Sequence, residues 1–218
     1  MILGRGTVSG RFITLEGGEG AGKSTQARWL ADAVRALGLT VLSTREPGGA
    51  PGAEILRSLL LSGETTWSPL AETLLHYAAR AEHVERAIRP ALLSGVWVVC
   101  DRFADSTMAY QGYGQGADRR TIGTLAELIG LKPDLTIILD VSENEALSRR
   151  VTRGDPADRY EREDAGFHAR VRDGFRAIAA AEPGRCVLVA ADGSREQVRA
   201  AICDVVMQRL GLMLPDLV

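Results

Sequence analysis

The chain of 218 residues is 45% hydrophobic and 25% charged, values typical of a globular protein that exclude a disordered or fibrous chain. Its formal net charge is −2, so it lacks the overall positive field that generic nucleic-acid binding needs. No apolar run approaches the ~18 residues that span a bilayer, and the N-terminal MILGRGTVSG lacks the apolar stretch of a signal peptide. Three scattered cysteines, Cys100, Cys186 and Cys203, indicate reduced thiols in a cytoplasmic protein rather than a disulfide framework or a zinc site.

Short apolar runs alternate with longer amphipathic stretches along the chain. Strands are predicted over residues 12–16, 40–44, 96–100, 135–139 and 187–190. Helices are predicted over residues 24–37, 53–61, 70–94, 106–111, 119–129, 143–153, 162–181 and 195–210, the third with a kink or an end near Pro90. This alternation predicts βαβ units, and hence a single α/β domain over residues 1–218 with a three-layer, doubly wound, parallel five-stranded sheet.

The segment after the first predicted strand fits the nucleotide-binding pattern G-x-x-x-x-G-K-[ST]. Its residues are Gly17, Gly18, Glu19, Gly20, Ala21, Gly22, Lys23 and Ser24, followed by Thr25. The glycines let backbone N–H groups point at phosphate oxygens, and the following helix adds its positive dipole end. Lys23, one of only two lysines in the chain, is placed to reach the β- and γ-phosphates, and the Ser24 hydroxyl to hold Mg²⁺. A chance glycine-rich turn is the alternative, and the strand before and helix after the loop argue against it.

Glu19 is unusual because it puts a carboxylate into a loop built for anions. Two interpretations stand: a solvated side chain that leans outward, or a hydrogen-bond acceptor for a hydroxyl of a second substrate.

Several further motifs occur in one order along nearly the whole chain. They are Glu16–Thr25, Thr44-Arg45-Glu46-Pro47-Gly48-Gly49, Asp101-Arg102-Phe103 with Ser106, Ala109-Tyr110-Gln111-Gly112, Pro133-Asp134-Leu135, Leu139-Asp140-Val141, Arg150, Arg153-Gly154 and Tyr160-Glu161. Together they resemble the bacterial thymidylate kinases, which are P-loop kinases. The resemblance implies transfer of the γ-phosphoryl group of ATP to dTMP, with Mg²⁺, by a homodimer. The acceptor, a phosphate monoester, is already an anionic nucleophile at pH 7, so the chemistry needs positioning and charge neutralisation rather than a general base.

Asp101 and Arg102 follow the apolar run 96–100, and therefore lie at the carboxyl end of a parallel strand, where ligands bind. Asp101 can hold Mg²⁺ directly or through water, and Arg102 can clamp the acceptor phosphate with two hydrogen bonds. A surface ion pair that caps the strand end is the alternative. The resemblance implies that Arg57 also binds the acceptor phosphate, against a solvated helix face as the alternative. Arg45 is a weaker candidate, whose loop is expected only to shape the pocket.

The predicted helix 70–94 carries two stripes. An apolar stripe of Leu70, Leu74, Tyr77, Ala81, Val84, Ile88 and Ala91 predicts core or a dimer interface. A second face carries His76, Arg80 and His83. From the residues alone, this face is expected to be exposed to solvent. The resemblance implies that Arg80 bonds the thymine base and that His76 takes the stacking position where the family commonly has Phe. An imidazole can titrate, so dTMP binding is expected to weaken as pH falls through about 6.5.

The segment after Asp101 supplies Thr107, Tyr110 and Gln111. The resemblance implies that these residues bind dTMP by reading the base edge and crowding the 2′ side of the sugar. Tyr110 would exclude a 2′-hydroxyl, because a buried hydroxyl without a partner is costly. Ordinary packing is the alternative for Tyr110.

Five arginines surround a Gly-Asp-Pro break at residues 154–156. They are Arg149, Arg150, Arg153, Arg159 and Arg162, and their mutual repulsion predicts either a solvated basic loop or a lid at about 149–162 that closes on ATP. In the second interpretation Arg150 or Arg153 stabilises charge on the moving phosphoryl group, and Lys23 and Arg102 complete the catalytic set. Another branch of the family has an arginine in the phosphate loop where this chain has Gly20, so the arrangement matches the bacterial branch.

One alternative belongs to the same class of protein, and two belong to different classes. A kinase for another nucleoside monophosphate is the nearest, and Arg80 with residues 107–111 argues for a pyrimidine pocket. A regulatory GTPase needs an N-K-x-D motif, which the sequence lacks. A DNA-associated ATPase needs a basic track, against which the net charge of −2 argues.

Overall fold

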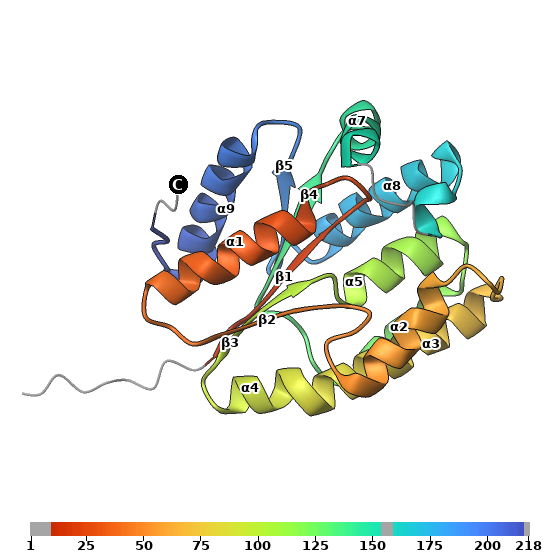
Figure 1. Ribbon diagram of the computed structural model, residues 1–218, viewed down its shortest axis with the longest axis horizontal. Coiled ribbons are helices and arrows are strands. Elements are labelled where there is room, and N and C mark those ends of the chain that lie inside the picture. Colours follow the sequence, from red (N-terminus) through yellow and green to blue (C-terminus); the bar gives the residue numbers. More distant parts are fainter. Residues whose placement is uncertain (1–9, 154–158, 216–218) are drawn as a thin grey trace, which may run out of the picture.

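The computed structural model describes residues 10–153 and 159–215, without the side chain of Arg153. Its centre is a sheet of five strands, all parallel, in the order β2-β3-β1-β4-β5 (Figure 1). The strands are β1 (Phe12–Gly17), β2 (Val41–Arg45), β3 (Trp97–Asp101), β4 (Leu135–Asp140) and β5 (Cys186–Ala190). The predicted α/β class, three-layer architecture and five-stranded parallel sheet are confirmed.

Helices cover both faces of the sheet. They are α1 (Lys23–Ala36), α2 (Pro51–Leu61), α3 (Pro69–His83), η1 (Val84–Ile88, a π-helix), α4 (Arg89–Leu93), α5 (Ala104–Thr107), η2 (Met108–Gly114, a π-helix), α6 (Arg119–Ile129), α7 (Glu143–Arg153), η3 (Tyr160–Arg162, a 3₁₀ turn), α8 (Ala165–Ala181) and α9 (Arg195–Leu210). Helices α1 and α9 pack on one face, and α4, α5 and α8 on the other (Figure 1).

The strands alternate their side chains between two cores, as the period of two in a strand requires. Ile13 and Leu15 of β1 point into the core under α1 and α9. Phe12 points into the opposite core, where its ring meets the edge of Phe103 with centroids 4.9 Å apart. Because both faces are covered, every residue of β1 is buried, which explains why the central strands are apolar runs.

The long helix predicted over 70–94 is one irregular helix made of α3, η1 and α4. The irregularity lies just before Pro90, at the π-helical turn Val84–Ile88. A proline ring collides with the carbonyl group four residues earlier in an α-helix, and a wider turn relieves that collision. The helix therefore continues through Pro90, so of the two expected outcomes an end at this residue is wrong.

The apolar stripe of this helix divides into two parts. Tyr77, Val84 and Ile88 are buried, as predicted for core residues. Leu70 and Leu74, at the start of α3, are 54% and 47% exposed. Within the described residues, no helix combines the length and apolarity that crossing a bilayer requires.

Candidate functional site

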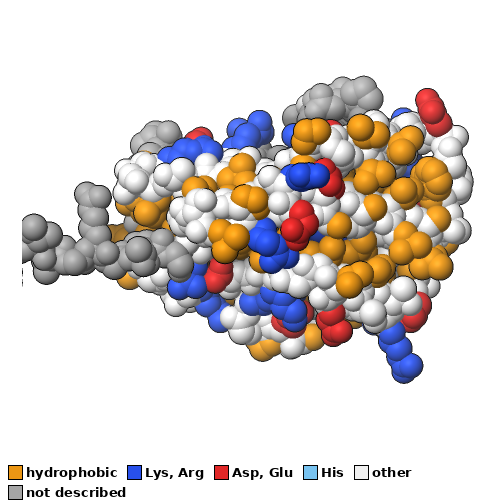
Figure 2. Space-filling view, turned by 90° about the horizontal axis from the view of Figure 1, so that it is seen from below, with side chains coloured by type: hydrophobic (Ala, Val, Ile, Leu, Met, Phe, Trp, Pro, Cys, Tyr) orange, Lys and Arg blue, Asp and Glu red, His pale blue; other side chains and the backbone are white. Residues whose placement is uncertain are grey.

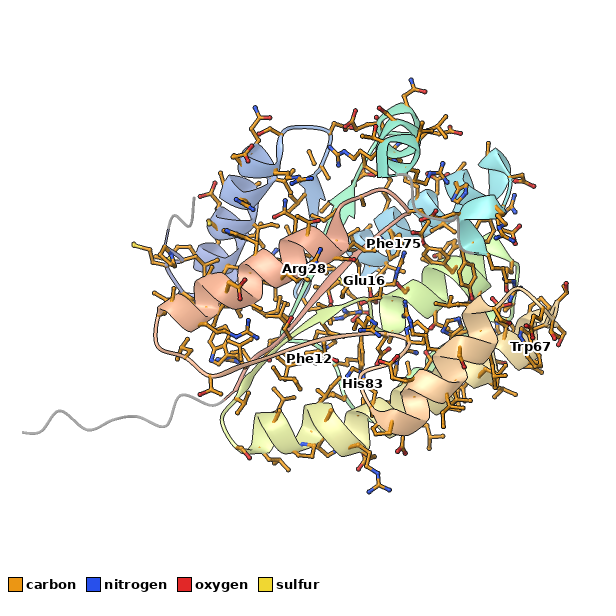
Figure 3. All side chains as sticks on the ribbon, viewed as in Figure 1. Phe12, Glu16, Arg28, Trp67, His83 and Phe175 are labelled. Carbon is orange, nitrogen blue, oxygen red and sulfur yellow. The ribbon has the colours of Figure 1, made fainter. Side chains whose placement is uncertain are left out.

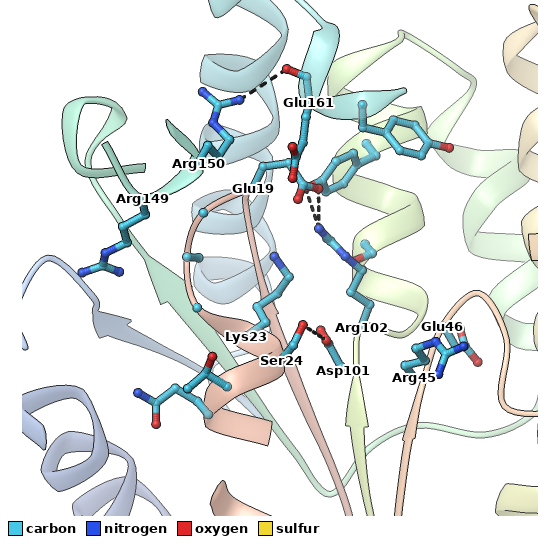
Figure 4. Close-up of a pocket in the computed structure, with 18 of the residues that line it drawn as sticks. Glu19, Lys23, Ser24, Arg45, Glu46, Asp101, Arg102, Arg149, Arg150 and Glu161 are labelled. Atoms are coloured by element: carbon cyan, nitrogen blue, oxygen red, sulfur yellow. Dashed lines mark hydrogen bonds and ion pairs between the residues drawn. The ribbon is translucent and has the colours of Figure 1, made fainter. Parts of the chain in front are cut away.

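A cleft of about 940 Å³ opens at the carboxyl ends of the strands (Figure 4). It lies where β1 has β3 on one side and β4 on the other, which is the point in the strand order where open α/β sheets bind ligands. The phosphate loop, α2, α3, η2, α7 and η3 all contribute residues to its walls.

The phosphate loop depends on glycine for its shape. Gly17 has a φ of 134°, and a Cβ atom there would lie 2.4 Å from the Leu139 carbonyl oxygen. Gly22 has a φ of 87° at the N-cap of α1, and no side chain caps that end of the helix. The N-terminal N–H groups of α1 are therefore available to an anion, as the sequence pattern predicts.

Lys23 is buried, with 6% of its surface exposed, and donates a hydrogen bond of 2.6 Å to the Gly18 carbonyl oxygen. Burial and the nearby Arg102 guanidinium lower the pKa of Lys23 to about 8. An anion beside the ammonium group would offset both effects, because an opposite charge favours the charged form. The environment of Lys23 therefore fits a phosphate group.

Ser24 and Asp101 meet at the other side of the loop, where the Ser24 hydroxyl donates to Asp101 Oδ2 (Figure 4). Asp101 Oδ1 is buried and has no hydrogen-bond partner. A hydroxyl and a carboxylate with an unused oxygen are the ligands that Mg²⁺ takes together with phosphate oxygens and water. The described residues contain no group of three or more His, Cys, Asp or Glu side chains arranged for a metal. The Ser24 hydroxyl and the free Asp101 oxygen by themselves fit a cation that also binds nucleotide phosphates.

Glu19 points into the cleft, where it binds the Arg102 guanidinium and accepts a hydrogen bond of 2.7 Å from the Tyr110 hydroxyl. Burial raises the pKa of Glu19, but the Arg102 and Lys23 charges outweigh burial and bring it down to about 2. The interpretation of Glu19 as an outward, solvated side chain is therefore wrong. Glu19, Arg102 and Tyr110 form one polar cluster that lines the cleft.

Arg102 has a left-handed backbone with a φ of 70°, which is unfavourable for a residue with a side chain. Glu16, fully buried at the end of β1, stabilises the loop that follows Arg102 (Figure 3). Its carboxylate accepts hydrogen bonds from Phe103 N at 2.7 Å and from the Ser106 hydroxyl at 2.6 Å. Burial raises the pKa of Glu16 to about 8. Sequence reasoning assigned Glu16 no role of its own, although its position at a strand end, like that of Asp101, was a usable signal.

Two arginines near the end of β2 differ in their hydrogen-bond partners. Arg57 lines the cleft and donates one hydrogen bond of 2.7 Å to the Pro47 carbonyl oxygen. Arg45 spreads one nitrogen over both carboxylate oxygens of Glu54, at 3.1 Å each. Arg45 also lines the cleft, but its charge is paired with Glu54, whereas Arg57 has no ion-pair partner among the described residues.

Arg80 is buried beside the inner end of the cleft. It donates 2.7 Å to Glu46 Oε2, 3.0 Å to the Phe103 carbonyl oxygen and 3.1 Å to the Thr107 hydroxyl. Its remaining nitrogen, Nη1, is buried without a partner. Arg80 therefore keeps one nitrogen without a hydrogen-bond partner, and the Thr107 hydroxyl accepts a hydrogen bond from another. The expected solvated helix face is wrong, because Arg80 is 2% exposed.

Glu46 was not singled out by sequence reasoning, yet it anchors this side of the site. Besides Arg80, its carboxylate contacts His83 Nδ1 at 3.1 Å, and His83 Nε2 contacts the Thr44 hydroxyl at 2.7 Å. His83 is fully buried behind Arg80 and does not line the cleft (Figure 3). Its spacing from His76 and Arg80 placed it on the same helix face, but its ring contacts Glu46 and Thr44 rather than the cleft.

His76 lines the cleft, and its Nε2 lies 2.9 Å from the Tyr160 hydroxyl. Burial, followed by the charge of Arg80, lowers the pKa of His76 to about 3. The imidazole is therefore neutral throughout the range of ordinary assays. The expectation that dTMP binding weakens as His76 titrates near pH 6.5 is wrong, because an exposed imidazole was assumed for a buried one.

Two of the five arginines of residues 149–162 are already paired with carboxylates of the protein. Arg149 pairs with Glu145 at 2.8 Å, and Arg159 with the buried Glu72 at 2.5 Å. Arg150 lines the cleft, contacts His168 Nε2 at 3.3 Å, and has a buried Nε without a partner. Residues 154–158, in the middle of the predicted lid, and the side chain of Arg153 lie outside the described residues, so the lid stays a prediction. The expectation of five unpaired cations is corrected for Arg149 and Arg159.

The phosphate loop with its buried lysine, the serine–aspartate oxygen pair and the arginines across the cleft define a P-loop kinase for a small phosphorylated acceptor. The family model described as Thymidylate kinase matches residues 15–202, and the chain belongs to the thymidylate kinase family. It is a nucleoside monophosphate kinase that phosphorylates dTMP with ATP.

Relatives match over nearly their whole length. The thymidylate kinase of Caulobacter vibrioides is 54% identical over 93% of this chain and 99% of its own. That of Gluconobacter oxydans is 53% identical over 92% and 96% of the two chains. The crystal structure of thymidylate kinase from Ehrlichia chaffeensis has a TM-score of 0.75 and 36% identity, covering 91% of this chain and 99% of that one.

Proposed function

We propose that the transfer to dTMP proceeds in line between two phosphates, with Lys23, Arg102 and Arg150 supplying the positive charge. The observation that carries this proposal is the convergence of buried Lys23 and Arg102 on the phosphate loop, where the charges of Glu19, Asp101 and Glu16 favour their charged forms. Arg150, on α7, also lines the cleft, and its buried Nε has no hydrogen-bond partner. The reaction needs no general base from the protein. His76 would be a weak base at neutral pH, because burial lowers its pKa to about 3.

The acceptor nucleotide is placed by residues on both sides of Arg102. Arg102 and Arg57 bind its phosphate, and Glu19 with Tyr110 borders the sugar, where the tyrosine ring leaves no partner for a 2′-hydroxyl. The base faces residues Arg80, Thr107, Gln111 and His76 at the inner end of the cleft. ATP lies along the loop Gly17–Thr25.

Ser24 and Asp101 would hold Mg²⁺ bound to the nucleotide. When bound, the metal ion would neutralise charge on the donor phosphates. The unpartnered Asp101 Oδ1 supports this assignment.

Replacing Asp101 by asparagine is expected to raise the Mg²⁺ concentration for half-maximal activity at least about tenfold, because one anionic ligand is lost. A coupled ADP-release assay with dTMP and a titration of Mg²⁺ measures it. Asp32→Asn, an exposed carboxylate on α1, is the control. An unchanged Mg²⁺ requirement for Asp101→Asn would remove this residue from the metal site.

We also propose that the enzyme is a homodimer formed through α2 and α3. The two helices pack together and expose Ile55, Leu59, Leu70 and Leu74, at 66%, 48%, 54% and 47%. Apolar side chains gather on this side of the molecule (Figure 2). Exposed apolar patches of this kind mark interaction surfaces.

Replacing Leu74 by glutamate is expected to convert the dimer to a monomer, because the interface would bury two unpaired charges. Light scattering on a sizing column is expected to give about twice 23.4 kDa for the unaltered protein and one copy for the variant. Met207→Glu, at an exposed position on α9, is the matched control and stays dimeric. A monomeric unaltered protein contradicts the proposal.

The cytoplasm is the location we propose, because Cys100, Cys186 and Cys203 are all free thiols. Cell fractionation tests it, and recovery of the enzyme with the membrane fraction would contradict it.

A further inference from the structure

Glu72 on α3 is a carboxylate buried with no exposed surface, outside the set of residues assigned to the reaction. Its Oε1 accepts hydrogen bonds of 2.8 Å from each of Gln111 Nε2, Gln115 Nε2 and the Tyr160 hydroxyl. Its Oε2 lies 2.5 Å from Arg159. A carboxylate so surrounded by donors can only accept, so it dictates which way each partner turns.

The first consequence concerns Gln111. Its NH₂ group must face Glu72, so its carbonyl oxygen Oε1 is the amide atom left for a ligand. Gln111 lines the cleft, and among the described residues no donor contacts this oxygen. Glu72 therefore makes Gln111 a hydrogen-bond acceptor toward the cleft.

The second consequence concerns His76. The Tyr160 hydroxyl has one proton, which it donates in its hydrogen bond to Glu72 Oε1. The contact of 2.9 Å between that hydroxyl and His76 Nε2 then requires the imidazole to donate, which selects the neutral tautomer with the proton on Nε2. One carboxylate thus orients two side chains of the proposed base pocket.

These orientations match one kind of pyrimidine. Arg80 Nη1 offers a buried, unpartnered donor, and Gln111 offers an acceptor. Thymine presents a carbonyl oxygen at position 4 and an N–H at position 3, which complements this pair. Cytosine presents an amine and a bare nitrogen at the same positions, which opposes it.

We propose that Glu72 is a positioning residue that makes the enzyme prefer thymine over cytosine, by holding Gln111 as an acceptor and His76 in its Nε2-protonated form. The proposal rests on the base pocket assigned above. Glu72 does not line that pocket. Its loss therefore changes which donor and acceptor atoms face the base, but not which residues line the pocket.

Glu72→Gln tests the proposal because Arg159 fixes the orientation of the new amide group. The guanidinium keeps the amide oxygen at the former Oε2 position, so the NH₂ group takes the place of Oε1. Gln111 then turns its own oxygen toward residue 72 and its NH₂ group toward the cleft. The ratio of kcat/KM for dTMP to that for dCMP is expected to fall at least about tenfold, mainly through the KM for dTMP.

Two further variants make the result specific. Asp105→Asn also removes a buried carboxylate, one that binds Arg185 at 2.7 Å and does not line the cleft. It is expected to lower the melting temperature and leave the base preference unchanged. Gln111→Leu is expected to raise the KM for dTMP. If it does not, the assigned base pocket is wrong and this proposal falls with it. If Gln111→Leu acts but Glu72→Gln leaves the ratio unchanged, Glu72 is merely structural.

A measurement on the unaltered protein covers the case in which Glu72→Gln does not fold. Nitrogen-15 NMR of the imidazoles, with His76→Phe identifying the His76 signal, reports the tautomer directly. The proposal expects a neutral Nε2-protonated ring throughout about pH 5.5 to 8. A proton on Nδ1, or a titration within that range, overturns it.

Discussion

Lys23→Ala is expected to lower kcat for dTMP phosphorylation to well below a tenth, because no other described lysine reaches the phosphate loop. The ammonium group would act on the phosphoryl group in transfer, and a tenfold loss corresponds to only about 1.4 kcal/mol of transition-state stabilisation. A variant that keeps more than about a tenth of kcat would rule out the assigned role.

The Lys23→Ala variant is expected to lose activity but to keep or gain stability. Folding lowers the pKa of Lys23 from 10.5 to about 8, mainly by burial. The charged form is thus disfavoured in the folded protein, a cost that is fully present below pH 8 and disappears as pH rises past about 10.5. At pH 7 the melting temperature of Lys23→Ala is therefore expected to be unchanged or higher. Lys132→Ala, at an exposed lysine, is the control for both assays.

Arg102→Ala is expected to lower kcat/KM for dTMP by about a thousandfold, with the KM raised at least tenfold. Arg102 would bind the acceptor phosphate, and it also neutralises Glu19. Without Arg102 the Glu19 carboxylate faces the incoming phosphate unbalanced, which adds repulsion to the lost clamp. Adding Glu19→Gln to Arg102→Ala is therefore expected to restore part of the dTMP affinity. A double variant with no recovery would show that the two residues act separately.

Arg150→Ala provides the comparison for Arg102→Ala in steady-state kinetics. Arg150 has no assigned contact with the acceptor, so its loss is expected to lower kcat and leave the KM for dTMP nearly unchanged. The same result is expected for Arg153→Ala from its place in the sequence. An effect on KM alone in either variant would assign that arginine to ground-state binding.

Features built from contiguous residues were predictable from the sequence alone. The phosphate loop from Gly17 to Ser24 works through its own backbone and the helix that begins behind it, so its pattern carries its chemistry. Asp101 lies beside this loop because β3 pairs in parallel with β1. The sequence predicted this position, since Asp101 follows an apolar run and parallel strands end at the same edge of a sheet. The alternation of strands and helices likewise determined the fold class.

The protonation and the hydrogen-bond partners of several site side chains depend on residues distant in the sequence. Only the tertiary structure decided them. Glu72 and Tyr160 are 88 positions apart, and Glu16 and Ser106 are 90 apart. No local spacing encodes such pairs, because side chains on different elements meet only after the elements pack. Burial lowers the pKa of His76 to about 3, and Glu72 neutralises Arg159, whereas helical periodicity and charge counts predicted a titrating ring and a free cation. Desolvation and ion pairing are properties of the packed interior, and they reversed both predictions.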